Sequence, residues 1–313
     1  MNALAWMGKH ATALLAGGVF VGLALPDLAT LARPLLVPTI VVMLVFSLLR
    51  LQPTAIAAAA RSPGRVLPVV GFVLLLSPAI GQAGVMLLGV EQWLGIGVAV
   101  AVVVWTASPP LVSVTALATI LGLDGALALM AMTLGGLLMP LTLPPLVLGL
   151  IGLDLQIGVG ELMMRLTGLL ALAAILATTV RKIVGENRIH RHTEAIDGGF
   201  VLIMLIFAIA VMDGVTAAAV ADPWKVAGMV VLVFAVSLAL QAIGFALFLP
   251  WGRRTATTVA LIGGNRNMAI VLGAAPAAFH PDAFLYLAIL QFPIYLLPAL
   301  LRPIYRKYGA DAP

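Results

Sequence analysis

The chain has 313 residues, of which 63% are hydrophobic and only 9% are charged, with 17 basic and 12 acidic side chains. A soluble domain carries about 25% charged residues, so this composition excludes a soluble globular protein and requires a surface that faces hydrocarbon. The formal charge of +5 does not indicate nucleic-acid binding, because the basic residues fall between apolar runs, and the absence of cysteine excludes disulfides and thiolate metal sites.

Ten apolar runs are long enough to cross a bilayer at about 20 residues per span. The first run follows Lys9, as in a signal sequence, but leads directly into further spans and is expected to stay uncleaved. The fourth is interrupted by Ala107-Ser108-Pro109-Pro110 and the ninth by Gly263-Gly264-Asn265-Arg266-Asn267. The predicted spans are residues 11–25, 34–51, 67–88, 94–121, 126–151, 162–180, 200–215, 226–249, 256–278 and 284–301.

The basic residues divide unevenly if the spans alternate from a cytoplasmic N-terminus. Thirteen fall on the cytoplasmic side and three on the other, with Arg266 left inside a span. Since cytoplasmic loops carry the excess of Lys and Arg, this split predicts ten spans with both termini in the cytoplasm. The short loops favour a bacterial inner membrane. The thirteen are Lys9, Arg50, Arg61, Arg65, Arg181, Lys182, Arg188, Arg191, Arg253, Arg254, Arg302, Arg306 and Lys307, and the three are Arg33, Arg165 and Lys225.

The ten spans form two halves of opposite orientation, residues 1–155 and residues 156–313, with five spans in each. Ser108 and Gly264 are about half the chain length apart, so the two interruptions occupy corresponding places. Paired Gly or Pro interruptions of this kind are typical of a transporter's central binding site. Freed backbone is tolerated at membrane depth only inside protein or beside a watery cavity. The pattern therefore predicts an all-α secondary transporter with inverted repeats; two unrelated kinks are the alternative.

The interruption in the fourth span suggests an anion site. Pro109 and Pro110 fit the first turn of a helix, so a new half-helix is expected to begin there with Ser108 as its N-cap. The positive end of that half-helix favours an anion. Ser113 and Thr115 add hydroxyls, for which the alternative is a hydrogen bond to their own helix backbone.

The interruption in the ninth span contains Arg266, flanked by Asn265 and Asn267, and Gly263 and Gly264 are expected to let the helix unwind. A central arginine costs about 2.5–3.5 kcal/mol to insert. All twelve acidic residues lie at or near span ends, so none is an evident partner. We predict that these residues and the fourth-span half-helix bind the acidic group of an organic anion. The alternative is that Arg266 ties together backbone carbonyls at a helix crossing.

Three stretches of the chain resemble the bile acid:sodium symporter family. They are Ser108-Pro109-Pro110-Leu111-Val112-Ser113-Val114-Thr115, Leu123-Asp124-Gly125-Ala126-Leu127-Ala128 and Leu261-Ile262-Gly263-Gly264-Asn265-Arg266-Asn267. The resemblance implies ten helices in two inverted five-helix repeats, with the fourth and ninth helices unwound and crossing. It also implies a core domain of spans 3–5 and 8–10 and a panel domain of spans 1–2 and 6–7.

The positions at which that family holds sodium have changed in this chain. The resemblance places them at Val114, Thr115, Ala128, Met132 and Leu261, and it places the family's following glutamine at Asn265; only Thr115 and Asn265 keep a side-chain oxygen. Hard cations need several oxygen ligands, and Arg266 stands where the family has an asparagine. A fixed guanidinium there would take the place of sodium's charge and repel the ion, so we expect no sodium coupling and no bound metal.

The predicted function is secondary transport of a small organic anion, such as a carboxylate or a sulfonate, by alternating access without sodium. The substrate gradient, anion exchange or a co-transported proton would drive it. Sodium-coupled symport is one alternative, and a non-transporting receptor or a channel on the same fold is another. We predict no enzyme and no cofactor, because the sequence has no phosphate-binding loop and no intramembrane acid–base cluster. His190, His192 and Glu194 lie among basic residues, which disfavours a metal site there.

Overall fold

The computed structural model describes residues 6–7, 10–50, 63–151, 157–185, 188, 191 and 193–309. Over these residues the regular structure is helical, and the only β-type pairing is one isolated bridge between Pro110 and Arg266. Seven helices of the described part are long and apolar enough to cross a membrane, and two shorter apolar helices cover Leu14–Ala24 and Ile96–Ala107. The chain is therefore an all-α membrane protein, as its composition predicts.

The helices form two compact units, each of which joins two separate parts of the chain. Unit 1 contains Met1–Leu51 and Arg165–Trp224, and unit 2 contains Gln52–Met164 and Lys225–Pro313. The helices of unit 1 are α2 (Ala11–Ala24), α3 (Pro26–Ala32), η1 (Arg33–Leu35), α4 (Leu36–Arg50), most of α12 (Val159–Val184), α14 (Thr193–Ala210) and α15 (Val215–Ala221).

Unit 1 is built around α14, which packs against α2, α3 and α4. The approach to α2 is close, because a Cβ added at Gly18 would lie 2.5 Å from the side chain of Leu205. Small residues allow such close packing of membrane helices. Beyond the end of α14, the carboxylate of Asp213 accepts hydrogen bonds from Arg33 at 2.7 Å and from Thr30 at 2.6 Å. The seventh predicted span, residues 200–215, lies within the candidate membrane span Gly198–Ala221, in which α14 ends at Ala210 and α15 begins at Val215.

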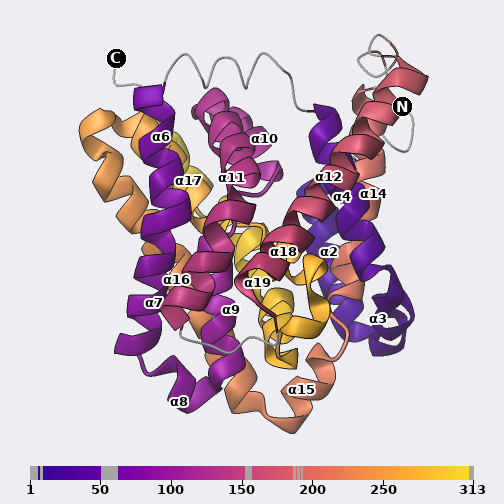
Figure 1. Ribbon diagram of the computed structural model, residues 1–313, viewed down its shortest axis with the longest axis vertical. Helices are drawn as coiled ribbons and strands as arrows, with labels where there is room; N and C mark the ends of the chain where they lie inside the picture. The colour runs from indigo at the N-terminus through magenta and orange to yellow at the C-terminus, as the bar shows by residue number, and fades with distance from the viewer. Residues whose placement is uncertain are drawn as a thin grey trace. The chain divides into compact units, whose positions relative to one another are not determined.

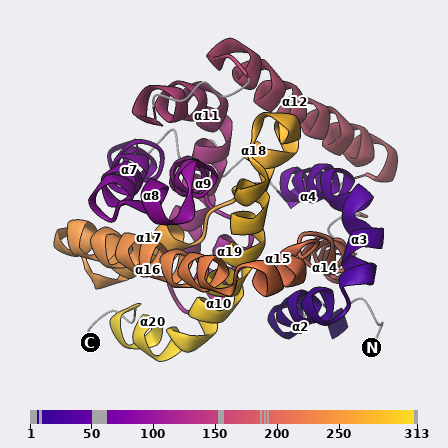
Figure 2. The same cartoon turned by 90° about the horizontal axis from the view of Figure 1, so that it is seen from below.

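Unit 2 contains the two interrupted helices and their surroundings (Figure 1). Its elements are α6 (Pro63–Gly71), η2 (Phe72–Leu76), α7 (Ser77–Leu87), α8 (Val90–Leu94), α9 (Ile96–Ala107), α10 (Ser113–Ile120), α11 (Gly125–Ile151), α16 (Pro223–Phe248), η3 (Leu249–Trp251), α17 (Arg253–Gly264), α18 (Ala269–Ala274), η4 (Pro276–Ala278), α19 (Pro281–Leu300) and α20 (Arg302–Gly309). Figure 2 shows α16 and α17 side by side, in contact at Gly263 and Leu240, with α20 next to α17.

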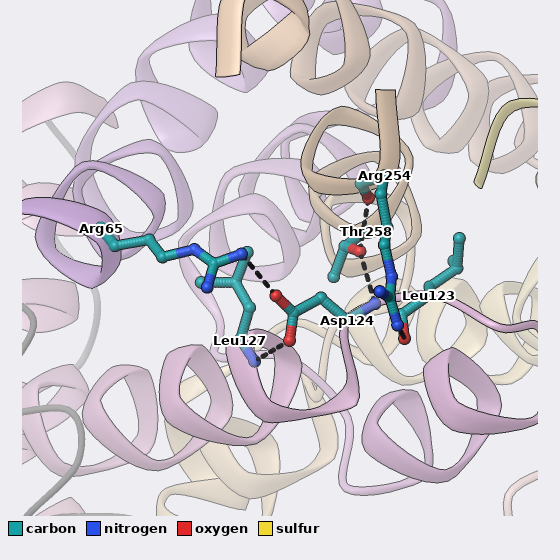
Figure 3. Close-up of polar contacts among 6 residues, drawn as sticks. All are labelled: Arg65, Leu123, Asp124, Leu127, Arg254 and Thr258. Carbon is teal, nitrogen blue, oxygen red and sulfur yellow. Dashed lines mark hydrogen bonds and ion pairs between the residues drawn. The ribbon is translucent and has the colours of Figure 1, made fainter. Parts of the chain in front are cut away.

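One end of unit 2 is fixed by Asp124, the residue before α11 (Figure 3). Its carboxylate accepts the backbone N–H of Leu127 at 2.9 Å, which caps α11, and pairs with Arg65 of α6 at 2.7 Å. Its own backbone N–H donates to the hydroxyl of Thr258 on α17 at 3.0 Å. Arg254 adds a bond to the carbonyl of Leu123 at 3.4 Å. Three helices of unit 2, α6, α11 and α17, are therefore tied together at this end.

Replacing Asp124 with alanine should lower the free energy of unfolding by about 1 kcal/mol, because it removes the N-cap of the longest helix in unit 2. The pair with Arg65 adds little, since half of the Arg65 side chain is exposed. Thermal unfolding in detergent, followed by circular dichroism, measures the loss. Asp27→Ala is the matched control, since Asp27 is exposed in the first turn of α3. An equal shift in both variants would contradict the role given to Asp124.

Candidate functional site

The two interrupted helices of unit 2 meet at their breaks. Residues 108–112 separate α9 from α10, and residues 265–268 separate α17 from α18. The two segments run antiparallel and exchange backbone hydrogen bonds, from the N–H of Leu111 to the carbonyl of Asn265 at 3.0 Å and from the N–H of Asn267 to the carbonyl of Pro109 at 2.8 Å. Each break therefore provides hydrogen-bond partners for some of the backbone groups that the other break leaves unpaired. We call this arrangement the crossing.

The start of the second half-helix differs from the sequence prediction. We expected it at Pro109 and Pro110 with Ser108 as the N-cap, but α10 begins at Ser113, after Val112. Ser108 instead ends α9 in an extended conformation, and its hydroxyl donates to the carbonyl of Val104 at 2.6 Å. The reason is that a residue before proline avoids the helical region, and the following residues pair with the other break before a helix can resume.

The two glycines before Asn265 also serve a different purpose from the predicted one. Gly263 and Gly264 are the last residues of α17 and have no positive φ, so they do not unwind the helix. A Cβ on Gly264 would lie 2.4 Å from the side-chain nitrogen of Gln241, and one on Gly263 would lie 3.0 Å from the carbonyl oxygen of Leu240. Their lack of a side chain allows α17 to contact α16.

A third helix supplies a free carbonyl to the crossing. Residues Phe72–Leu76 form one turn of π-helix, in which the N–H of Ser77 bonds to the carbonyl of Phe72 rather than to that of Val73. The next residue able to bond Val73 in this pattern is Pro78, which has no N–H. The carbonyl of Val73 is therefore left without a partner from its own helix.

The side chain of Arg266 donates hydrogen bonds to the carbonyls that the helices leave unpaired. The side chain is 1% exposed, and its nitrogens donate to four neutral oxygens. Nε bonds the carbonyl of Gly263 at 3.0 Å, Nη1 bonds those of Val73 at 2.9 Å and Ser108 at 3.2 Å, and Nη2 bonds the hydroxyl of Ser77 at 2.7 Å. Of the two roles that the sequence left open, this geometry is that of a tie between backbone carbonyls. It ties three helical rods of unit 2 together at one point, namely α6–α7, α9–α10 and α17–α18.

Of the other candidate polar side chains at the crossing, some form hydrogen bonds and others have none in the described structure. The amide of Asn265 donates to the carbonyl of Leu261 at 2.8 Å. Asn267 and Ser113 are half-buried, and within the described part of the chain their side chains have no hydrogen bond. Thr115 Oγ1 is buried and also has no partner there. The alternative role for these hydroxyls was a hydrogen bond to the backbone of their own helix. Ser108 forms such a bond, and Thr115 does not.

The positions that correspond to the family's sodium ligands lie in apolar surroundings. Val114, Ala128 and Leu261 are fully buried members of one hydrophobic cluster, and Met132 is 8% exposed. Among the described residues no group of three His, Cys, Asp or Glu could hold a metal ion. His190 and His192, considered above as metal ligands, lie outside the described residues.

Two buried polar side chains near the crossing were not found from the sequence. Trp105, in the last turn of α9, and Tyr286 of α19 are both 0% exposed, with ring centroids 6.3 Å apart. The indole nitrogen and the phenol oxygen have no hydrogen-bond partner in the described structure. Trp105 lies close enough to the break to have been a candidate, whereas no sequence pattern distinguishes Tyr286 from a core residue.

Comparison with protein-family models gives no match to the chain, and comparison with curated proteins gives none either.

Replacing Gly264 with alanine should destabilise the protein by about 1–3 kcal/mol, because the new methyl group would overlap Gln241. Gln241 cannot move aside freely, since it is hydrogen bonded to Ser237 and to the hydroxyl of Tyr305. Thermal unfolding measures the effect. Gly136→Ala in α11 is the control, since nothing lies within 4 Å of its added Cβ, and it should be neutral or slightly stabilising. Equal behaviour of the two variants would argue against tight packing at the crossing.

Proposed function

We propose that this protein is a secondary transporter that moves a small organic anion by alternating access. The observation that carries the proposal is the pairing of two interrupted helices, which lie half a chain apart in sequence and cross through main-chain hydrogen bonds. Discontinuous helices of this kind typically form the substrate site of secondary transporters. The proposed architecture is ten spans in two inverted repeats, on the fold of the bile acid:sodium symporter family.

The division of the chain into two units supports a core that moves against a panel. Unit 2 holds the helices of predicted spans 3–5 and 8–10, which are those of the proposed core. Unit 1 holds those of predicted spans 1–2 and nearly all of spans 6–7, which are those of the proposed panel. In the proposed mechanism one unit moves as a body while the other stays fixed.

The proposed orientation places both termini in the cytoplasm of a bacterial cell, with the protein in the inner membrane. The distribution of charge within unit 2 supports it. Arg65 and Arg254 bond Asp124 and Leu123 at the end of the unit where α11 begins, and α20, which carries three basic residues, packs beside α17. The other end has Lys225, which is paired with Asp282 at 2.9 Å. An excess of basic residues marks the cytoplasmic side.

We further propose that transport is not coupled to sodium. Coordination of a hard cation at the crossing would need carbonyl and hydroxyl oxygens. Arg266 already donates to three carbonyls and one hydroxyl there. A second cation beside the buried guanidinium would be repelled, because like charges are screened less in the protein interior than in water.

Uptake of radiolabelled anions by proteoliposomes tests the proposal. Carboxylates and sulfonates should enter saturably, at equal rates in sodium and in choline buffer, and preloading with unlabelled substrate should accelerate uptake by exchange. A requirement for sodium would favour a sodium symporter. Binding without flux would indicate a receptor, and conductance above about 10⁵ ions per second a channel; either result would contradict the proposed function.

Replacing Arg266 with alanine should destabilise the protein by about 3 kcal/mol or more, because three buried carbonyls lose a partner at about 1 kcal/mol or more each. Guanidinium at millimolar concentration should raise the melting temperature of Arg266→Ala and leave that of the wild type unchanged. Urea, which has a similar shape without the charge, is the matched control for the ligand. Arg266→Lys, which keeps the charge, should lose less stability. A variant that is as stable as the wild type would show that the four bonds do not hold the crossing.

A further inference from the structure

Unpaired buried polar atoms point to where the anion binds. Five buried side-chain atoms in the described structure have no hydrogen-bond partner, and all five belong to unit 2; they are in Gln82, Trp105, Thr115, Thr133 and Tyr286. An unpaired polar group in a protein interior is costly. A native structure that keeps such groups leaves them for a water molecule, an ion or a ligand.

Trp105 and Tyr286 are the pair among these that is completely buried. Both are 0% exposed, they come from packed helices α9 and α19, and their rings are 6.3 Å apart. An indole N–H can only donate, and a phenol O–H donates readily. Two donors without an acceptor suit the oxygen of a ligand, and an oxyanion accepts more strongly than a neutral group does.

The charge that would balance such an oxyanion is linked through the backbone to the last turn of α9, which carries Trp105. The N–H of Ser108 bonds the carbonyl of Trp105 at 3.0 Å, and the carbonyl of Ser108 accepts from Arg266 at 3.2 Å. All the oxygens bound by the guanidinium are neutral, so its positive charge is not compensated by these contacts. In surroundings of low dielectric constant, that charge favours an anion over several ångströms.

We propose that the indole N–H of Trp105 and the hydroxyl of Tyr286 bind an oxygen of the substrate's monovalent oxyanion group. Arg266 contributes through its field and does not touch the substrate. The inference rests on the proposed transport function and adds the residues that contact the substrate and the charge of the group they hold. The anion thus lies beside the crossing, on the α9 and α19 side of it.

Tryptophan fluorescence gives a direct measurement of binding, because Trp105 is the only buried tryptophan in the described structure. Trp6, Trp93, Trp224 and Trp251 are 43–86% exposed. Benzoate and benzenesulfonate are the probes, and benzamide is the neutral counterpart of benzoate. Both anions should change the emission of the reconstituted wild type and compete with uptake, whereas benzamide should do neither. Trp105→Phe should abolish the change in emission, and Trp93→Phe, whose indole bonds the carbonyl of Leu88 at 3.0 Å, should keep it.

Tyr286→Phe removes one oxygen atom and leaves the ring in place. It should raise the dissociation constant of the anions about tenfold or more, as expected for a hydrogen bond to a charged group. The melting temperature without ligand should equal or exceed that of the wild type, because the variant has no unpaired hydroxyl. Tyr308→Phe, a half-buried tyrosine of α20, should leave binding unchanged.

Wild-type affinity in both Trp105→Phe and Tyr286→Phe, with transport intact, would overturn this inference and leave the proposed function standing, and the two donors would then hold only water. A complete absence of anion binding and flux in the wild type would overturn the proposed function itself.

Discussion

The structure of unit 2 depends on the guanidinium of Arg266. A helix that breaks inside a membrane leaves peptide groups with no water to bond, and each such group is costly in hydrocarbon. The two breaks at the crossing satisfy only part of this need through the bonds of Leu111 and Asn267. The carbonyls of Val73, Ser108 and Gly263, from three different helical rods, are completed by one side chain. A single planar group with five donors is well suited to this task, and a lysine could not reach all of these oxygens with the same geometry.

This arrangement determines what the crossing can bind. Three of its carbonyls and the hydroxyl of Ser77 already accept from Arg266, and the side-chain positions of the family's sodium ligands are apolar except at Thr115, so a cation would find few ligands and an unfavourable potential there. The buried charge instead favours an anion, for which Trp105 and Tyr286 provide donors without partners. The bonds of Asp124 at one end of the unit and those of Arg266 at the crossing also connect the same rods, α6–α7 and α17, at two levels. Unit 2 is therefore braced as a single body.

Much of the fold follows from the sequence, because apolar runs and their interruptions report directly on helices in a membrane. The breaks after Ala107 and Gly264 lie where the sequence predicts them. The partners of Arg266 did not follow, since they depend on a π-turn at Phe72 and on Pro78, which are distant in sequence and are recognised only when the helices pack. The predicted start of the second half-helix was wrong. Pro109 and Pro110 suit a helix start, but their segment pairs with the other break, and α10 begins only at Ser113. Tyr286 has no local signal at all.

The most direct test of this account is a distance measurement between spin labels, which the absence of native cysteine makes straightforward. One pair joins the exposed positions Leu87, at the end of α7, and Ile120, at the end of α10, within unit 2, and a second pair joins Leu87 to the exposed Val220 of unit 1. If Arg266 braces the crossing while the units move, a transported anion should shift the distances of the second pair and leave those of the first unchanged, equally in sodium and in choline. A change confined to the pair within unit 2, or one that requires sodium, would contradict a braced crossing with a built-in cation.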